Sequence, residues 1–281
     1  ADLINFIGRI VPISEFKAVD KLLLGSDFIH QRVHVLEGKP LHIEGHNELI
    51  IKSLISLYEC DYKLPSEVLA REIEALVKAT KYDNCSAVVY IYVCPPKKGV
   101  RSSVDWIMSI GKQLLYKGYV LWHSPLKAVI TKYEYPFPEF PTAVSLAAHN
   151  YAMGHAERRG ADITLTQNYK KIITGAGPYP FFAISRDRVF TTPIENGSLD
   201  SVARRLGIKA SEAAGLTVIE QPIYSESITD FEEFFIVTPQ GVESIGTLND
   251  TLYPTSTAKV IAEKMRNLTD HPLIIDSIYI E

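Results

Sequence analysis

The sequence lacks any apolar run of the roughly 18 to 20 residues that a helix needs to cross a bilayer. It also lacks an excess of basic residues, since 29 lysines and arginines stand against 33 aspartates and glutamates, a net charge of -4. A chain without a positive field does not attract a phosphate backbone, so no nucleic-acid partner is expected. The opening stretch ADLINFIGRIVP has no basic region followed by a clean apolar one, and a cytoplasmic protein that binds no membrane is expected.

Cysteine is scarce as well. Cys60, Cys85 and Cys94 make an odd count without CxxC spacing, which favours buried thiols in a reducing compartment over a disulfide framework or a zinc site. His42 and His46 have the spacing of metal ligands, but no carboxylate completes the set, and no metal site is predicted. No GxSxG, P-loop, HExxH or GxGxxG motif is present, so hydrolase and nucleotide-binding functions have no motif behind them.

What is present is a succession of strand-like and helix-like segments. The first part of the chain contains a strand pair, a hairpin that turns at Glu37, Gly38 and Lys39, two helices and a strand of β-branched and aromatic residues. In that order they span residues 3–12, 28–43, 46–58, 65–80 and 86–93. They predict an α+β domain over residues 1–118, with a linker at about 115–126.

Alternating prolines in YEYPFPEFP exclude a helix, and this stretch lies near the start of a second domain that is expected over residues 119–281. Helices are expected at 145–159, at 199–207 and at 256–268, the second of them ending on Gly207. Strands are expected in DITLTQ, KKIITGAGPYPFFAIS, VFTTP, LTVIEQP, EEFFIVTP and GVESIG. A chain of 281 residues suits two such domains, because single cores stop growing at roughly 250 to 300 residues.

This order of segments resembles the class IV aminotransferases, which depend on pyridoxal phosphate (PLP) and include branched-chain aminotransferase, D-amino-acid aminotransferase and aminodeoxychorismate lyase. The resemblance covers nearly the whole chain and is carried by GSDFIHQRVHVLEG, AHNYAMGHAERRGAD, IITGAGPYPFF with AISRDRVFTTP, and EEFFIVTPQGVESIG. It implies a two-domain α+β fold with a smaller N-terminal domain, a larger C-terminal domain with a barrel-like β core, PLP between the domains, and usually a homodimer.

The residues that the resemblance assigns to catalysis differ here. The family's Schiff-base lysine precedes the AHNYAMGHAERRG-type helix, where this chain has no lysine. The family's glutamate, which pairs with the pyridine nitrogen, is replaced by Thr174, which can hydrogen-bond but carries no negative charge. The residues at these two places are Pro141, Thr142, Ala143, Val144 and Ser145 for the lysine, and Thr174 followed by Gly175, Ala176 and Gly177 for the glutamate.

The family's phosphate-binding elements differ too. Leu49 stands where the resemblance puts a phosphate-binding arginine, and the loop of the GITR type reads Ile194-Glu195-Asn196-Gly197-Ser198. No PLP is therefore expected. The sequence predicts a class IV aminotransferase-like protein that binds a small anionic or amino-acid-like molecule or a partner, with Thr238 also counted as a pocket residue.

Two alternatives remain open. The chain could be an active PLP enzyme that uses an unusual lysine such as Lys127 or Lys132, although both have the pattern of surface lysines. It could also act without PLP on an acidic small molecule. His30, Arg32 and His34 occupy every second position and so share one face of a predicted strand, where they could hold an anionic group. The competing interpretation of that face is a solvent-facing strand. His149 and His155 lie on different faces of one helix, and neither is expected to be catalytic.

Overall fold

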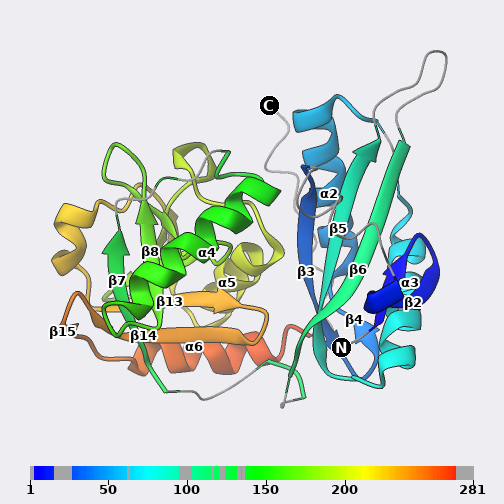
Figure 1. Ribbon diagram of the computed structural model, residues 1–281. Coiled ribbons are helices and arrows are strands. Elements are labelled where there is room, and N and C mark those ends of the chain that lie inside the picture. Colours follow the sequence, from blue (N-terminus) through cyan, green and yellow to red (C-terminus); the bar gives the residue numbers. More distant parts are fainter. Residues whose placement is uncertain are drawn as a thin grey trace. The chain divides into compact units, whose positions relative to one another are not determined.

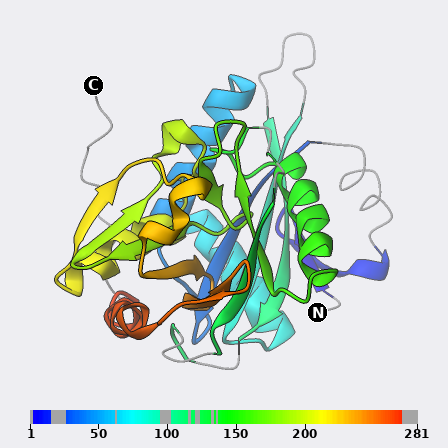
Figure 2. The same ribbon diagram turned by 90° about the vertical axis from the view of Figure 1, so that its left-hand side faces the viewer.

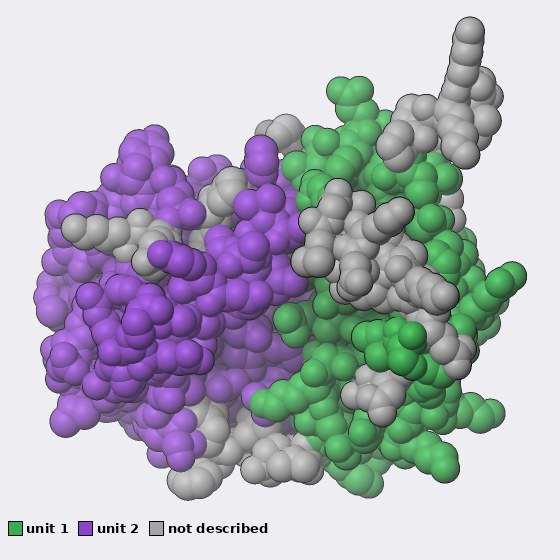
Figure 3. All heavy atoms as spheres, viewed as in Figure 1, with its two compact units in different colours: residues 1–118, 270–281 green, residues 119–269 purple. Residues whose placement is uncertain are grey.

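The computed structural model describes residues 3–15, 27–61, 64–94, 103–114, 117–119, 124–131, 134 and 137–269. The chain divides into two compact units, one of residues 1–118 with 270–281 and one of residues 119–269 (Figure 3). Part of the expected linker at 115–126 lies outside the described residues. No helix in the described ranges is long and apolar enough to cross a membrane.

The first unit contains a six-stranded sheet, in the strand order β2-β1-β6-β5-β3-β4, with helices α2 and α3 packed on it (Figure 1). Its strands are β1 (Leu3–Phe6), β2 (Arg9–Pro12), β3 (Ile29–Leu36), β4 (Lys39–Pro40), β5 (Cys85–Cys94) and β6 (Ser103–Gln113). Its helices are η1 (Ile13–Glu15), α2 (Ile43–Tyr58) and α3 (Ser66–Thr80). The odd-numbered residues of β3 and β5 pack with α2 and α3 in one apolar core, as the period of two in a strand requires.

The sequence predicted most of this unit. The strand pair, the hairpin with Gly38 at a φ of 81°, both helices and β5 are confirmed. Strand β6 was not predicted, although its residues 104, 106, 108 and 110 are apolar and pack in or against the core. Pro65 is the N-cap of α3 and precedes its first turn, where its fixed extended conformation suits the entry to the helix.

The second unit holds a nine-stranded sheet that curls into a half-barrel, in the order β12-β11-β10-β13-β14-β7-β8-β9, with β15 paired to β14. The strands are β7 (Leu126–Thr131), β8 (Ile163–Gln167), β9 (Ile173–Gly175), β10 (Phe181–Ser185), β11 (Arg188–Thr191), β12 (Thr217–Glu220), β13 (Glu233–Thr238), β14 (Gly241–Leu248) and β15 (Thr251–Leu252). The helices are α4 (Ala143–Glu157), η2 (Ile194–Asn196), α5 (Val202–Ala213), η3 (Ser225–Asp230) and α6 (Ser256–Arg266), the last seen almost end-on in Figure 2. The α+β fold with a curled β core is the one that the sequence predicted.

One helix boundary in this unit was wrong. Helix α5 does not end on Gly207 but continues to Ala213. Gly207 is buried inside the helix, and an added Cβ would lie 2.5 Å from the ring of Phe182 and 3.0 Å from Val237. The glycine therefore serves close packing of α5 on the sheet, a role that cannot be distinguished from a helix end in the sequence alone.

Candidate functional site

Thr174, which the sequence analysis assigns to the position of the family's glutamate, lies on β9 and is hydrogen-bonded within the sheet. Its hydroxyl is 3.0 Å from the Thr166 hydroxyl on β8 and donates to the Thr166 carbonyl at 3.3 Å. The Thr166 hydroxyl in turn donates to the Gly175 carbonyl at 3.1 Å. The residue before Thr174, Ile173, accepts a hydrogen bond at its carbonyl from the Thr192 hydroxyl, at 2.6 Å. The polar groups of this cluster satisfy one another.

The loop after Thr174 packs tightly against α4. Gly177 has a φ of 66°, and an added Cβ would lie 2.7 Å from Cγ of His149 and closer still to its Nδ1. The His149 ring also meets the ring of Tyr179 edge to face, with centroids 6.1 Å apart. The sequence did not predict this role for His149, because nothing in the local pattern of α4 indicates which loop the side chain reaches.

The segment that the sequence analysis assigns to the position of the family's lysine, residues 141–145, leads into the N-terminus of α4. Thr142 is the N-cap residue, and its hydroxyl accepts a hydrogen bond from the Ser145 N–H at 3.4 Å. The Ser145 hydroxyl returns a bond of 2.7 Å to the Thr142 carbonyl. Pro141 and Thr142 are buried, Ala143 is partly buried and Val144 is exposed. These side chains cap and flank a helix, and none of them carries an amine.

The η2 to α5 connection lies against Thr174 and carries a carboxylate. An added Cβ on Gly197 would lie 3.1 Å from Cγ2 of Thr174, which places this connection next to the cluster. Ser201 is the N-cap of α5 and accepts from the Arg204 N–H at 3.1 Å. Asp200, 6% exposed, is paired with the Arg205 guanidinium at 3.4 Å.

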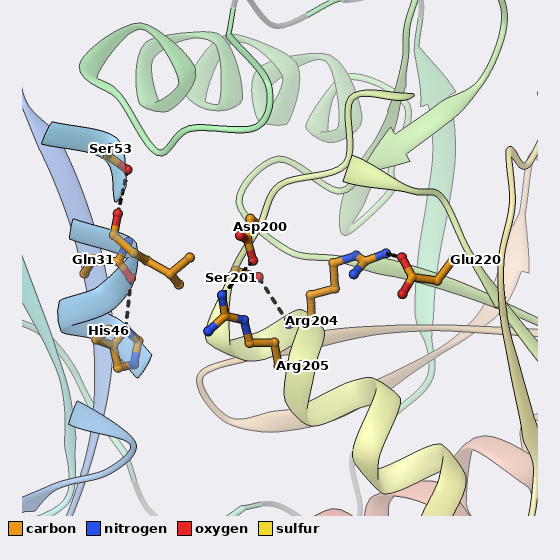
Figure 4. A network of polar contacts seen from close by, with 9 residues as sticks. Gln31, His46, Ser53, Asp200, Ser201, Arg204, Arg205 and Glu220 are labelled. Carbon is orange, nitrogen blue, oxygen red and sulfur yellow. Dashed lines mark hydrogen bonds and ion pairs between the residues drawn. The ribbon is translucent and has the colours of Figure 1, made fainter. Parts of the chain in front are cut away.

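Figure 4 draws this Asp200 pair beside a second one on the same helix. The buried Arg204 donates to the Glu220 carboxylate at 2.6 Å and to the Thr192 carbonyl at 3.2 Å. The start of α5 therefore presents a buried carboxylate next to the Thr174 cluster. The sequence analysis missed Asp200 and both arginines, although a serine three residues before Arg204 is a recognisable cap signal.

Lys127 lies at the other end of the strands that carry the Thr166 cluster. Ala128 pairs with Ile163, and Thr131 pairs with Thr166, so Lys127 is four residues from that level. At about 3.3 Å per residue this is roughly 13 Å along β7. Its Nζ is 3.2 Å from Asp250 in an exposed ion pair. Lys132 lies outside the described residues.

Thr238 ends β13 and accepts a hydrogen bond from the Gln240 N–H at 3.1 Å, while it donates to Glu243. The preceding N–H, of Val237, donates to the Pro180 carbonyl at 3.3 Å. Thr238 therefore lies near the end of the Gly175 to Gly177 loop and forms its hydrogen bonds inside its own hairpin.

The remaining candidates belong to the first unit. His30 and Arg32 lie on β3 and point away from α2, because the residue between them, Gln31, has its side-chain oxygen 2.9 Å from Nδ1 of His46 on that helix and accepts a hydrogen bond there. The solvent-facing interpretation of this face is wrong: His30 is 3% exposed and His34 is 5% exposed. The alternation of the strand was predicted correctly, but the burial of its polar side was not.

Leu49 is buried on α2, on the apolar side of the sheet and not on the face of His30 and Arg32. His42 is the N-cap of α2, and His46 is one turn further along it. Within the described residues, no group of three or more histidines, cysteines or carboxylates is arranged to hold a metal ion. His46 is instead bonded to Gln31.

Comparison with known proteins gives one family. The sequence model of amino-transferase class IV matches residues 32–238. A branched-chain aminotransferase from Thermoproteus uzoniensis superposes with a TM-score of 0.78 at 17% identity over 95% of this chain and 94% of its own. The Escherichia coli branched-chain aminotransferase gives 0.79 at 16% identity, over 97% and 95%.

A putative 4-amino-4-deoxychorismate lyase from Legionella pneumophila has a TM-score of 0.71 at 16% identity, over 85% of this chain and 89% of its own. No curated protein matches the sequence. At these identities the solved structures establish the fold and leave the reaction open.

Proposed function

The chain belongs to the class IV aminotransferase family, and we propose that it is a member without PLP chemistry that serves to bind a small molecule or a partner. The single observation that carries this proposal is that the Thr174 hydroxyl is hydrogen-bonded to Thr166. A pyridine nitrogen stays protonated in a PLP enzyme because a carboxylate faces it. A threonine whose hydroxyl is held by Thr166 offers neither the charge nor a free hydrogen bond.

The place where a Schiff base would form supports the same conclusion. An aldehyde needs a primary amine, and the residues at the family's lysine position are the N-cap Thr142 and its neighbours up to Ser145. Their hydroxyls are engaged in capping the helix. The residues present therefore do not fit PLP as a covalently held cofactor.

The start of α5 is also unsuited to a phosphate group. Helix N-termini attract anions through their N–H groups and the positive end of the helix dipole. Here the residue before the N-cap is Asp200, a buried carboxylate that is already paired with the Arg205 guanidinium, so the chain itself supplies an anion beside this helix start. The Ser201 hydroxyl already accepts one of the N–H groups.

The alternative, an active PLP enzyme based on Lys127, finds no support in the geometry. Lys127 is paired with Asp250 and lies at the far end of β7 from Thr166. A catalytic lysine is usually desolvated to lower the pKa of its amine, whereas this side chain is 37% exposed.

A visible absorption spectrum tests the proposal. The purified chain is incubated with PLP, desalted and scanned, then reduced with borohydride and mapped by peptide mass spectrometry. We expect no retained Schiff-base band and no reduced adduct on a single lysine. A retained band with one modified lysine would refute the proposal. A Lys127→Arg variant serves as the control: loss of such a band there would establish the alternative enzyme.

We also propose that the chain forms a homodimer. Helix α4 has no charged residue from Ala143 to Ala156, and it exposes Val144 by 46% and Tyr151 by 63%. An uncharged exposed helix face is typical of a contact surface. Light scattering is expected to give about twice the chain mass of 31.4 kDa, and a monomeric mass would exclude the homodimer.

A further inference from the structure

The sheet face of the first unit that points away from α2 and α3 is polar. It carries His30, Arg32 and His34 from β3, and the cross-strand partners of these residues on β5 are Tyr90, Val88 and Ser86. Cross-strand partners point to the same side of a sheet, so these side chains share one face. The opposite face, with the neighbouring odd-numbered residues, forms the apolar core.

Arg32 has no counter-charge in contact with it among the described residues. In the part of the chain that the structure describes, its guanidinium forms no ion pair and no hydrogen bond, and its Nε is enclosed without an acceptor. The Ser86 hydroxyl, on a residue that is 3% exposed, is likewise without a partner among the described residues. Buried donors left unsatisfied are uncommon in folded proteins, and a pair of them next to each other points to a missing acceptor.

Gly111 on β6 lies close to these two residues. An added Cβ there would lie 3.7 Å from Nη1 of Arg32, 3.3 Å from the Ser86 carbonyl and 2.7 Å from Cγ2 of Val88, so a side chain at this position would have to displace Val88. Gly111 itself is exposed, so this end of the face reaches solvent. The glycine therefore brings Arg32 and Ser86 close to the exposed end of the strand.

The charge of the neighbourhood is positive although the chain as a whole is acidic. Lys112 lies opposite Ser86 in register. Strands β3, β5 and β6 carry one carboxylate on this face, Asp105, whose partner Tyr92 is four residues along β5 from the partner of Arg32. At about 3.3 Å per residue that separation is roughly 13 Å. The guanidinium is thus placed to meet an external anion.

We infer that a small molecule bearing a carboxylate or a phosphate binds to Arg32 and Ser86 beside Gly111. A guanidinium fork and a hydroxyl suit two oxygens of such a group, and His34 lies next to them on the strand. The inference rests on the proposed binding function and names the class of its ligand.

Isothermal titration of the full chain with inorganic phosphate and, separately, with succinate at fixed ionic strength tests this site. The wild type should bind at least one of the two with saturation. Arg32→Gln should weaken that binding about tenfold or more, as expected for a lost charge-assisted hydrogen bond. Arg71→Gln is the matched control, because Arg71 is an exposed arginine paired with Glu72 on α3, and it should bind like the wild type.

The two probes distinguish a phosphorylated ligand from a carboxylate ligand. Binding of phosphate alone indicates a phosphorylated ligand, and binding of succinate alone indicates a carboxylate. Absence of binding for both, or equal affinity in Arg32→Gln and the wild type, would overturn the inference. If Arg32→Gln fails to fold, Ser86→Ala provides the test, since it removes a single buried hydroxyl that has no partner among the described residues.

This outcome is independent of the PLP experiment. A Schiff base on one lysine would refute the proposed function, yet anion binding that depends on Arg32 would still support the site. Conversely, the absence of a Schiff base with no Arg32-dependent binding would leave the proposed function standing and remove the site.

Discussion

Replacing Gly177 by alanine tests the packing of the Gly175 to Gly177 loop on α4. Two costs are expected. A residue with a Cβ at a φ of 66° costs roughly 1 to 2 kcal/mol of backbone energy. The Cβ would also overlap the His149 ring, and the displacement of a packed side chain costs roughly 1 to 3 kcal/mol more. Together the unfolding free energy should fall by about 2 to 5 kcal/mol.

The two costs can be separated by matched variants. Gly160 has a similar φ of 61°, but nothing lies within 4 Å of an added Cβ, so Gly160→Ala carries only the backbone cost. In a His149→Ala background, Gly177→Ala should likewise lose the overlap and cost about 1 to 2 kcal/mol. Urea unfolding of each variant, followed by circular dichroism, gives the free energies. Equal costs at Gly177 and Gly160, in both backgrounds, would show that the loop does not pack on His149.

Three further predictions concern stability. Glu233→Gln should lower the unfolding free energy by about 1 to 3 kcal/mol, because its 4% exposed carboxylate accepts two hydroxyls and two N–H groups at the start of α6. Glu226→Gln, in an exposed ion pair, should change it by no more than about 0.5 kcal/mol, and equal effects in urea titrations would contradict the cap. Asp200→Asn should cost about 1 to 3 kcal/mol by leaving Arg205 without its carboxylate, and a calorimetric melting temperature equal to that of the wild type would refute this. Burial, with a smaller contribution from a neighbouring aspartate, raises the pKa of the Cys85 thiol from 9.0 to about 11. The neutral thiol is thus favoured by folding, so stability is complete below pH 9 and falls between pH 9 and 11, a slope that Cys85→Ala should remove.

Local patterns predicted the elements of this fold well, because apolar residues recur with a period of two in a half-buried strand and of about 3.6 in an amphipathic helix. The alternation from Ile29 to Val35 identified the two faces of β3 correctly, and the glycine after Glu37 identified its turn. The prediction failed where the role of a residue depends on its contact with a residue far away in the sequence. Gly207 resembles a helix end but makes room for Phe182 on the neighbouring sheet.

The candidate site was less predictable for the same reason. The assignment of Thr174 and Leu49 to the family's cofactor positions depends only on order along the chain and stays a prediction. The sequence could not predict that Asp200 pairs with Arg205, because that contact depends on the backbone conformation of the residues that lead into α5. Nor could it predict that the His30 and His34 face is buried, since a period of two identifies a face but not what covers it.

The two polar clusters differ in how many of their hydrogen-bonding groups have a partner among the described residues. In the second unit, the hydroxyls of Thr166, Thr174 and Thr192 bond to one another or to carbonyls, and the Asp200 carboxylate has its own guanidinium. Those groups need no ligand, and a cofactor would have to break their bonds before it could use them. In the first unit, Arg32 and Ser86 hold donors that no described group accepts. A ligand would add bonds there without breaking any. The proposed loss of PLP chemistry and the inferred anion site are therefore compatible in one chain, because the free energy of binding depends on which groups the protein has left unsatisfied.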